Sequence, residues 1–272
     1  MGICPPLPRH RPRSPRHPPT TCNSSKDRRL RTLLIDGDIF VVSTLATHEV
    51  ETDWGDDQWT LHCDVKAAKA AILQAIENIK TELDADDAII CLSMGETFRH
   101  RLSPDYKSGR GRKPVGTGEV KRWLIEEHDA KLKPGIEADD TMGILATHPK
   151  LIKGEKIIVS QDKDMLTIPG KLYRGGEVID VSPGEARYNW MMQTLTGDVT
   201  DGYPGLKGMG KVKAAKLLDK LGPDEDPWPH VVAAYEKAGM TEEDALLQAR
   251  LARILHWTDY DFKTKEAILW QP

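Results

Sequence analysis

The sequence predicts an α/β fold with a central, mainly parallel sheet flanked by helices. Three short apolar runs, TLLI (32–35), AIICLS (88–93) and KIIVS (156–160), are typical of buried strands. Between the first two, residues 64–83 repeat apolar side chains at helical spacing and are rich in good helix formers. Strands that alternate with helical segments indicate parallel strands joined by helical crossovers. A late helix is expected over residues 241–257, because this segment opens with a capping box at Thr241.

The first 31 residues differ from the rest of the chain in composition. Residues 4–25 are rich in proline and arginine and have almost no apolar side chains, so we expect residues 1–31 to be a disordered basic extension. Residues 1–31 carry eight lysines or arginines against one acid, whereas the other 241 residues carry 30 against 41. Because the body of the chain is acidic, any nucleic-acid binding must depend on local basic patches and bound cations.

Composition favours a soluble, intracellular protein. Of the 272 residues, 39% are apolar and 29% charged, and no apolar run is long enough to cross a bilayer. The four cysteines show neither a CxxC pair nor the spacing of a metal site, which favours a reducing compartment. We expect no membrane partner.

Acidic residues gather in four segments at predicted strand ends and helix starts. The first strand runs into Asp36 and the third into a pair of aspartates, and the motifs GIEADDTMG (135–143) and GDVTDGYPG (197–205) add five more acids. The predicted metal ligands are Asp36, Glu137, Asp139, Asp140, Asp162, Asp164, Asp198 and Asp201. In an open parallel sheet, ligands bind beyond the carboxyl ends of the strands, so we expect these acids at one edge.

Bound cations explain why so many carboxylates can lie beside a core. Each acid alone could be a helix cap or turn residue. Together they would repel, by roughly 4 kcal/mol for two charges about 4 Å apart at a protein surface. Oxygen ligands favour hard cations such as Mg²⁺ or Mn²⁺. Two such ions roughly 3.5–4 Å apart are the arrangement that supports phosphodiester cleavage, so we expect two.

A basic segment, TFRHRLSPDYKSGRGRKP (97–114), is suited to binding phosphates. It has six basic residues against one acid, and its glycines and prolines predict a segment that is mobile or that orders on binding. Tyr106 is predicted to stack on a base. A solvated basic loop is the alternative. The basic residues are Arg99, Arg101, Lys107, Arg110, Arg112 and Lys113.

A second basic segment, GLKGMGKVKAAKLLDKLG (205–222), predicts a glycine turn that opens a helix. Such a turn lets backbone N–H groups and a helix N-terminus approach a phosphate. The pattern GxxxxGK[ST] is not met, which excludes a Walker A loop. The residues predicted to contact DNA here are Lys207, Gly208, Gly210, Lys211, Lys213 and Lys216.

Five motifs together resemble a known family. LLIDGD, TFR…YKSGR, IEADD, SQDKD and GDVTDGYPGLKGMG occur in the order seen in the 5′-3′ exonucleases of the flap-endonuclease superfamily, and the chain is most similar to those of short-tailed phages. The likeness covers the chain from about Thr32 to its end. It implies a PIN-like catalytic domain over 32–195, with a helical arch at about 95–133, and a helix-three-turn-helix DNA clamp with C-terminal helices over 196–272.

The resemblance also implies an activity. We expect a metal-dependent, two-metal 5′-3′ exonuclease acting on duplex DNA, with flap-endonuclease and RNase H-like cleavage of RNA–DNA hybrids, serving phage replication, primer removal or recombination. It further implies a monomer in the host cytoplasm. Arg99, Lys107 and Arg110 map onto the basic residues that orient the scissile phosphate. A potassium ion is implied at the turn of Gly205, Gly208 and Gly210.

One position departs from the family pattern. Where the family has an acid after the second strand, this chain has Met94, whose thioether is a poor Mg²⁺ ligand. Either Glu96 or a water molecule is expected to replace the missing oxygen. The departure leaves open a DNA-structure-binding protein without catalysis. A second alternative is a haloacid-dehalogenase-like phosphatase with Asp36 as the nucleophile, which leaves the glycine turn without a role.

Overall fold

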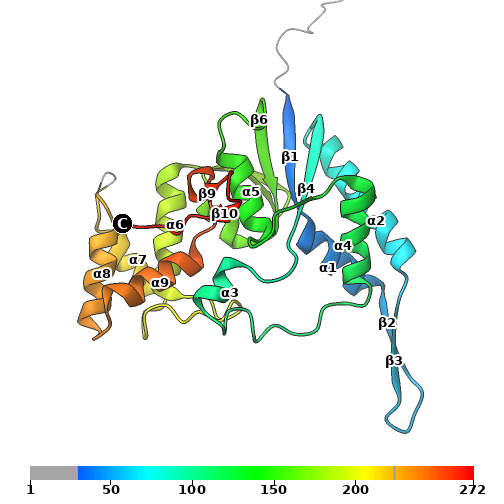
Figure 1. The fold of residues 1–272 in the computed structure, drawn as a ribbon, viewed down its shortest axis with the longest axis horizontal. Coiled ribbons are helices and arrows are strands. Elements are labelled where there is room, and N and C mark those ends of the chain that lie inside the picture. The colour runs from blue at the N-terminus through cyan, green and yellow to red at the C-terminus, as the bar shows by residue number, and fades with distance from the viewer. Residues whose placement is uncertain (1–29, 223–224) are drawn as a thin grey trace, which may run out of the picture.

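A six-stranded sheet forms the centre of the molecule (Figure 1). The computed structural model describes residues 30–222 and 225–272, so nearly all of the predicted basic extension lies outside the described residues. The sheet order is β5-β4-β1-β6-β7-β8, and all neighbouring pairs are parallel except β7 with β8. The prediction of a mainly parallel sheet is therefore confirmed. The strands are β1 (Arg31–Asp36), β4 (Asp87–Leu92), β5 (Lys131–Leu132), β6 (Glu155–Val159), β7 (Gly170–Arg174) and β8 (Glu177–Val181).

Helices cover both faces of the sheet, which explains why its central strands are apolar throughout. Leu33 and Ile35 of β1 pack in one core with α1 (Gly37–His48), α2 (Val65–Glu82) and α4 (Thr117–His128). Leu34, on the opposite face of the same strand, packs in another core with α5 (Ala138–Thr147). Alternate side chains of a strand point to opposite faces, so one strand contributes to both cores.

Besides these two cores, a largely helical core lies beside the sheet. It joins α6 (Pro183–Thr196), α7 (Lys211–Leu218), α8 (Trp228–Lys237) and α9 (Glu242–Ala252) around the fully buried Tyr235. The predicted capping box at Thr241 is present, and α9 begins one residue later. The helix ends at Ala252, earlier than the predicted end at residue 257, and residues 253–256 are not helical. A short ribbon of β9 (Tyr260–Asp261) and β10 (Glu266–Ala267), preceded by the 3₁₀ turn Trp257–Asp259, closes the chain.

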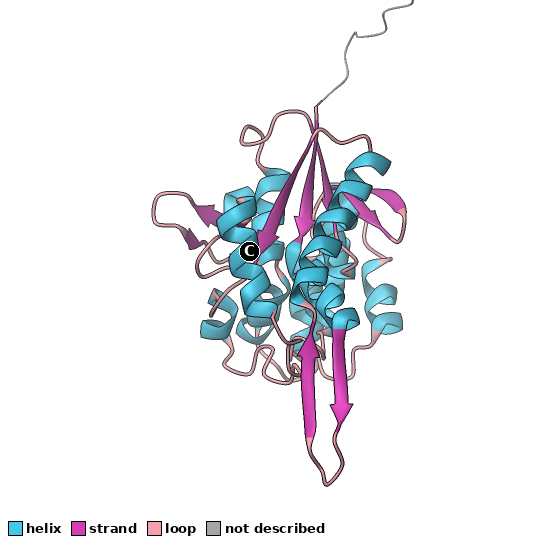
Figure 2. Cartoon of the chain, turned by 90° about the vertical axis from the view of Figure 1, so that its right-hand side faces the viewer, coloured by secondary structure: helices cyan, strands magenta, loops and turns pink. Residues whose placement is uncertain are grey.

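The segment predicted as a helical arch is only partly helical. It contains the one-turn α3 (Phe98–Leu102) and then residues 103–116, which have no helix, before α4. Because α4 packs in the main core, it belongs to the body of the domain. A β-hairpin that the sequence did not predict, β2 (Glu49–Asp53) and β3 (Trp59–Cys63), projects from the end of α1 (Figure 2). In the described part of the chain, no helix is long and apolar enough to cross a membrane.

Candidate active site

The buried carboxylate of Asp36 marks the carboxyl end of the central strand. Asp36 is 2% exposed and caps α1, accepting a hydrogen bond from the Ile39 amide at 3.1 Å. Its other oxygen accepts from the Ser160 hydroxyl at 2.6 Å, which ties the end of β1 to the residue after β6. Burial raises the pKa of Asp36 to about 6, and the nearby charges of Asp38 and Asp162 add to this rise.

Asp139 extends this acidic cluster from the first turn of α5. Burial raises its pKa well above the usual value, and the charges of Asp36, Glu137 and Asp162 raise it further. Three chain segments that are distant in sequence therefore place carboxylates within electrostatic reach of one another. The predicted gathering of acids at the sheet edge is present for these residues.

Asp162 and Asp164 occupy the turn after β6. Asp162 caps the 3₁₀ helix Lys163–Thr167, accepting from the Asp164 amide at 2.9 Å. Burial, and then the charge of Asp162, raise the pKa of Asp164 to about 7. Gln193 of α6 donates to the Asp164 carboxylate at 2.6 Å, so the helical core helps to position this acid.

The loop 197–205 brings the last two acids to the same side. Asp198 and Tyr203 pair as an isolated antiparallel bridge, and the loop is closed by Gly197 against Gly205. A Cβ on Gly205 would lie 2.3 Å from the Gly197 nitrogen, and Gly205 has a φ of +62°, so only glycine fits. Although burial alone would raise the pKa of Asp198, hydrogen bonds from Lys163 and two backbone amides hold it below its usual value.

Lys107 and Tyr106 each contact both Glu137 and Asp201, and so link acids from two separate chain segments. The Lys107 ammonium lies 2.7 Å from one oxygen of Glu137 and 3.6 Å from Asp201. The Tyr106 hydroxyl lies 3.1 Å from a carboxylate oxygen of each of the same two acids. Tyr106 is only 3% exposed and packs in the helical core. The prediction that Tyr106 stacks on a base is therefore wrong, because its ring faces the interior.

Arg99 and Asp140 form a buried ion pair. Arg99 is 2% exposed and Asp140 is fully buried, and the guanidinium donates to both carboxylate oxygens at 2.7 and 2.8 Å. Asp140 also accepts from the backbone amides of Glu137 and Leu255. Although burial alone would lower it, the Asp140 carboxylate holds the pKa of Arg99 above its usual value. Both predictions need correction: Asp140 has no oxygen left for a metal ion, and Arg99 cannot reach a phosphate.

The remaining basic residues of the 97–114 segment are closer to solvent. Arg110 is half exposed and pairs with Asp201. Arg112 pairs with Glu49 of the β2–β3 hairpin through two contacts, so it braces the hairpin in this structure. Arg101 and Lys113 are exposed. Apart from the buried Arg99, Lys107 and Arg110 are therefore the basic side chains of this segment that contact acids of the site.

The position that lacks the family acid is open to solvent. Met94 is 39% exposed, and Glu96 is exposed on the turn between β4 and α3. Next to it, the sequence-based reasoning missed Lys121 of α4, whose buried ammonium lies 2.6 Å from Asp38. The sequence signal that could have revealed Lys121 is its position directly after Val120, on a helix whose Val120 and Leu124 face the core.

The glycine turn opens α7 as predicted. Gly210 is the N-cap of α7 and offers no side-chain cap, and Lys207, Lys211 and Lys216 are exposed. Lys213 donates to the Gly208 carbonyl at 2.9 Å, so its ammonium binds a backbone carbonyl of the glycine turn. The Gly205 amide donates to Gln248 of α9, which fixes the turn to the helical core.

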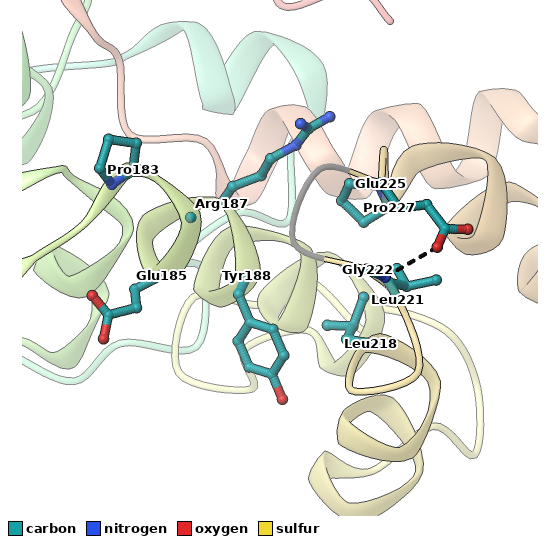
Figure 3. Close-up of a pocket in the computed structure, with 10 residues that line it drawn as sticks. Pro183, Glu185, Arg187, Tyr188, Leu218, Leu221, Gly222, Glu225 and Pro227 are labelled. Carbon is teal, nitrogen blue, oxygen red and sulfur yellow. Dashed lines mark hydrogen bonds between the residues drawn. The ribbon is translucent and has the colours of Figure 1, made fainter.

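A separate groove of about 640 Å³ lies between α6 and the chain after α7 (Figure 3). It is lined by side chains that include Arg187, Tyr188 and Leu218. None of the acids described above lines it, so this hollow is distinct from the acidic site.

The donor set fits hydrated divalent cations. In residues 30–222 and 225–272, no three acidic, histidine or cysteine side chains are close enough to hold a single metal ion together. The predicted cage of side-chain oxygens is therefore not present. Mg²⁺, however, usually keeps several waters and takes only one or two carboxylates from the protein. Asp36 and Asp139 match that mode of binding, because burial and then the charges of neighbouring acids raise the pKa of each.

Comparison with known proteins decides the family. Residues 31–179 match the family model described as the 5′-3′ exonuclease, N-terminal resolvase-like domain. The exonuclease of Escherichia phage T7 is 31% identical over 88% of this chain and 93% of its own length. The chain belongs to the 5′-3′ exonuclease family. The predicted enzyme class, a DNA-cleaving hydrolase, is thereby confirmed, and the phosphatase alternative is wrong.

Further relatives of this 5′-3′ exonuclease agree. The exodeoxyribonuclease of Enterobacteria phage T3 is 30% identical over 88% of this chain and 92% of its own length. The T5 5′-exonuclease, in a structure with bound zinc ions, is 13% identical and has a TM-score of 0.58 over 82% of this chain and 89% of that one. At this identity the structural likeness shows the shared fold.

Proposed function

We propose that this protein is a metal-dependent 5′-3′ exonuclease that removes nucleotides from the 5′ ends of duplex DNA. The observation that carries the proposal is the edge of the sheet, where burial raises the pKa values of Asp36 and Asp139 and the charge of Asp162 raises both further, beside the lysine of the YKSGR motif. Carboxyl groups whose pKa values are raised by burial and by neighbouring negative charge mark a candidate functional site. The T3 relative, an exodeoxyribonuclease, supports DNA as the substrate.

The acids divide into two groups that would hold two ions, Mg²⁺ or Mn²⁺. When bound, the ions would neutralise the scissile phosphate and favour ionisation of the attacking water. One group is Asp36, Asp139 and Asp162, which are electrostatically coupled. The other lies around Asp164, whose raised pKa reflects the charges of Asp198 and Asp201 as well as burial.

Lys107 and Arg110 are suited to binding the scissile phosphate. Each is held in the structure by a carboxylate, Lys107 by Glu137 and Arg110 by Asp201. Arg110 is half exposed and Lys107 is 17% exposed, so both can turn toward a phosphate at the mouth of the site. Their positive charge would stabilise the negative charge that develops as the bond breaks. Tyr106, buried behind them, would keep Glu137 and Asp201 in register.

The start of α7 would grip the duplex away from the scissile bond. Its uncapped amides and the exposed Lys207, Lys211 and Lys216 offer backbone and side-chain donors to phosphates. Lys213 would release the Gly208 carbonyl, either to contact DNA or to admit a potassium ion. Flapped duplexes and RNA–DNA hybrids are further substrates on this proposal, and the active form is a monomer that acts in the host cytoplasm. The similarity to phage exonucleases supports this location.

Cleavage of 5′-labelled duplex, flap and hybrid substrates in Mg²⁺ and Mn²⁺ tests the proposal. We expect metal-dependent release from the 5′ end by the wild type, and loss of cleavage with retained DNA binding in Asp164→Ala. Asp180→Ala is the matched control, because this β8 acid is 75% exposed and pairs with Lys171 at the sheet edge. Equal cleavage by Asp164→Ala and wild type would contradict the assignment.

A DNA-structure-binding protein without catalysis is the second candidate. It is favoured by the exposed Met94, which offers no oxygen, and by the absence of a three-ligand metal group among the described residues. Tight binding of flapped duplex with no cleavage at any divalent ion concentration would establish it. Restored cleavage in Met94→Asp would then show that the missing oxygen is the cause.

A further inference from the structure

Lys121 is a buried lysine on the helix that follows the basic segment. Its side chain is 7% exposed, and its Nζ lies 2.6 Å from Asp38 Oδ1 and donates to the Ser93 carbonyl at 2.9 Å. A buried ammonium is costly unless it is paired and hydrogen-bonded, and these two contacts meet that need. Apolar side chains already pack α4 on the core, with Val120 and Leu124 fully buried and Trp123 and Ile125 against them. The charge of Lys121 therefore has a local purpose other than packing.

The Lys121 contacts connect the ends of two central strands with the acidic site. Asp38 lies two residues after the end of β1, and its Oδ1 also accepts from the Ser93 amide at 3.2 Å. Ser93 follows β4, and its hydroxyl accepts from the amide of Ala138 at 2.7 Å. Ala138 is the first residue of α5, next to Asp139. The ammonium thus lies at the same sheet edge as the buried acids.

Asp38 is a carboxylate at this edge whose charge is engaged by the ion pair with Lys121. It is 28% exposed, whereas the lysine that binds it is buried. Its charge is one of those that raise the pKa of Asp36, so it is within electrostatic reach of the cluster. Met94, directly after Ser93, contributes no oxygen. Asp38 is therefore a nearby carboxylate that could take the place of the acid absent at Met94.

We propose that the Lys121 ammonium is an internal counter-ion that withholds Asp38 from divalent cations at the acidic site. Lys121 is a positioning residue, since it sets the metal affinity through Asp38 and does not touch substrate. Removing its charge would leave Asp38 free to turn toward a bound cation and would add one negative charge to the site. The inference rests on the proposed function, because it requires the acids to bind a divalent ion.

The test is the affinity for Mn²⁺, measured by titration calorimetry on the full-length protein without DNA. Lys121→Gln removes the charge but keeps a donor for the Ser93 carbonyl, and Lys121→Met keeps only the aliphatic stem. We expect both variants to bind Mn²⁺ about tenfold more tightly than wild type, because an unpaired carboxylate attracts a divalent ion strongly in a partly buried site. Arg122→Gln, a charge loss at the exposed neighbour on α4, should leave the affinity unchanged.

Asp38→Asn supplies a variant that keeps Lys121. It should bind Mn²⁺ more weakly than wild type, since the ammonium then faces the site without its counter-charge. The double variant Asp38→Asn with Lys121→Gln should lose the tightening seen in Lys121→Gln alone. Thermal melts of all variants check that the fold is retained.

Each other outcome overturns the inference. Unchanged or weaker Mn²⁺ binding in both Lys121 variants, with native melts, would mean that Lys121 only clamps Ser93. Tightening that persists in the double variant would remove Asp38 from the set of ligands. Wild-type affinity in Asp38→Asn would show that the pair has no influence on the site. Measurable binding by wild type with any of these results leaves the proposed function standing, whereas no Mn²⁺ binding by any variant would overturn both.

Discussion

Replacing Arg99 should destabilise the fold and not only slow catalysis. The guanidinium donates to both oxygens of Asp140, to Glu137, and to the backbone carbonyls of Leu251 and Arg253. In Arg99→Met, the fully buried Asp140 would keep only the backbone amides of Glu137 and Leu255 as partners. Removing one partner of a buried ion pair costs about 3–5 kcal/mol, because the other charge stays buried without compensation.

This cost is a large part of a typical unfolding free energy of about 5–15 kcal/mol. For a chain of this size it corresponds to a fall in melting temperature of about 6–20 °C. Urea denaturation and thermal melts of Arg99→Met would measure it. Arg101→Met, an exposed arginine on the same short helix, is the control and should change stability by less than about 0.5 kcal/mol.

A double variant separates the ion pair from packing. Arg99→Met with Asp140→Asn removes both charges and keeps an oxygen for the amide of Glu137. We expect it to be more stable than the sum of the two single variants predicts, by about 1–3 kcal/mol. If Arg99→Met melts like wild type and only loses DNA cleavage, Arg99 acts on the substrate and the structural argument fails.

Four further predictions concern the acidic site and the start of α7. In metal-free protein, Asp36 has a pKa of about 6 against 3.8 for an ordinary aspartate, so its contribution to stability is complete below pH 4 and falls by about 3 kcal/mol as the pH rises through 6. Chemical denaturation between pH 4 and 7 in a chelator should show the fall, and a rise would contradict it. Because Mn²⁺ needs ionised carboxylates, its affinity should increase from pH 5.5 to 7.5 with proton release, measurable by calorimetry in buffers of different ionisation enthalpy. Tyr106→Phe, which removes the hydroxyl between Glu137 and Asp201, should lower kcat more than KM and destabilise by about 1–3 kcal/mol, and an unchanged kcat would limit Tyr106 to packing. Lys213→Ala should weaken DNA binding and flatten its salt dependence, and an unchanged salt slope would remove Lys213 from the interface.

Local sequence patterns could predict where carboxylates gather but not what each of them binds. Asp36 and Asp162 follow apolar strands, and the rule that parallel strands end at one edge was enough to place them together. Asp140 lies only one residue after Asp139, yet the first is sealed in an ion pair and the second lies within the acidic cluster. Adjacent residues on a helix point about 100° apart, so their partners depend on what packs against each side.

The sequence by itself determined the parallel sheet, its helical crossovers, the order of the family motifs and the chemical character of the site, because apolar periodicity and residue type are local properties of the chain. Only the tertiary structure decided that Tyr106 and Arg99 face inward, that Arg112 braces the β2–β3 hairpin and that Lys121 pairs with Asp38. These contacts join residues between 31 and 154 positions apart, from Tyr106 with Glu137 to Arg99 with Arg253. Such pairings depend on how whole elements dock, because a side chain's charge state and partners are fixed by its burial in the assembled fold.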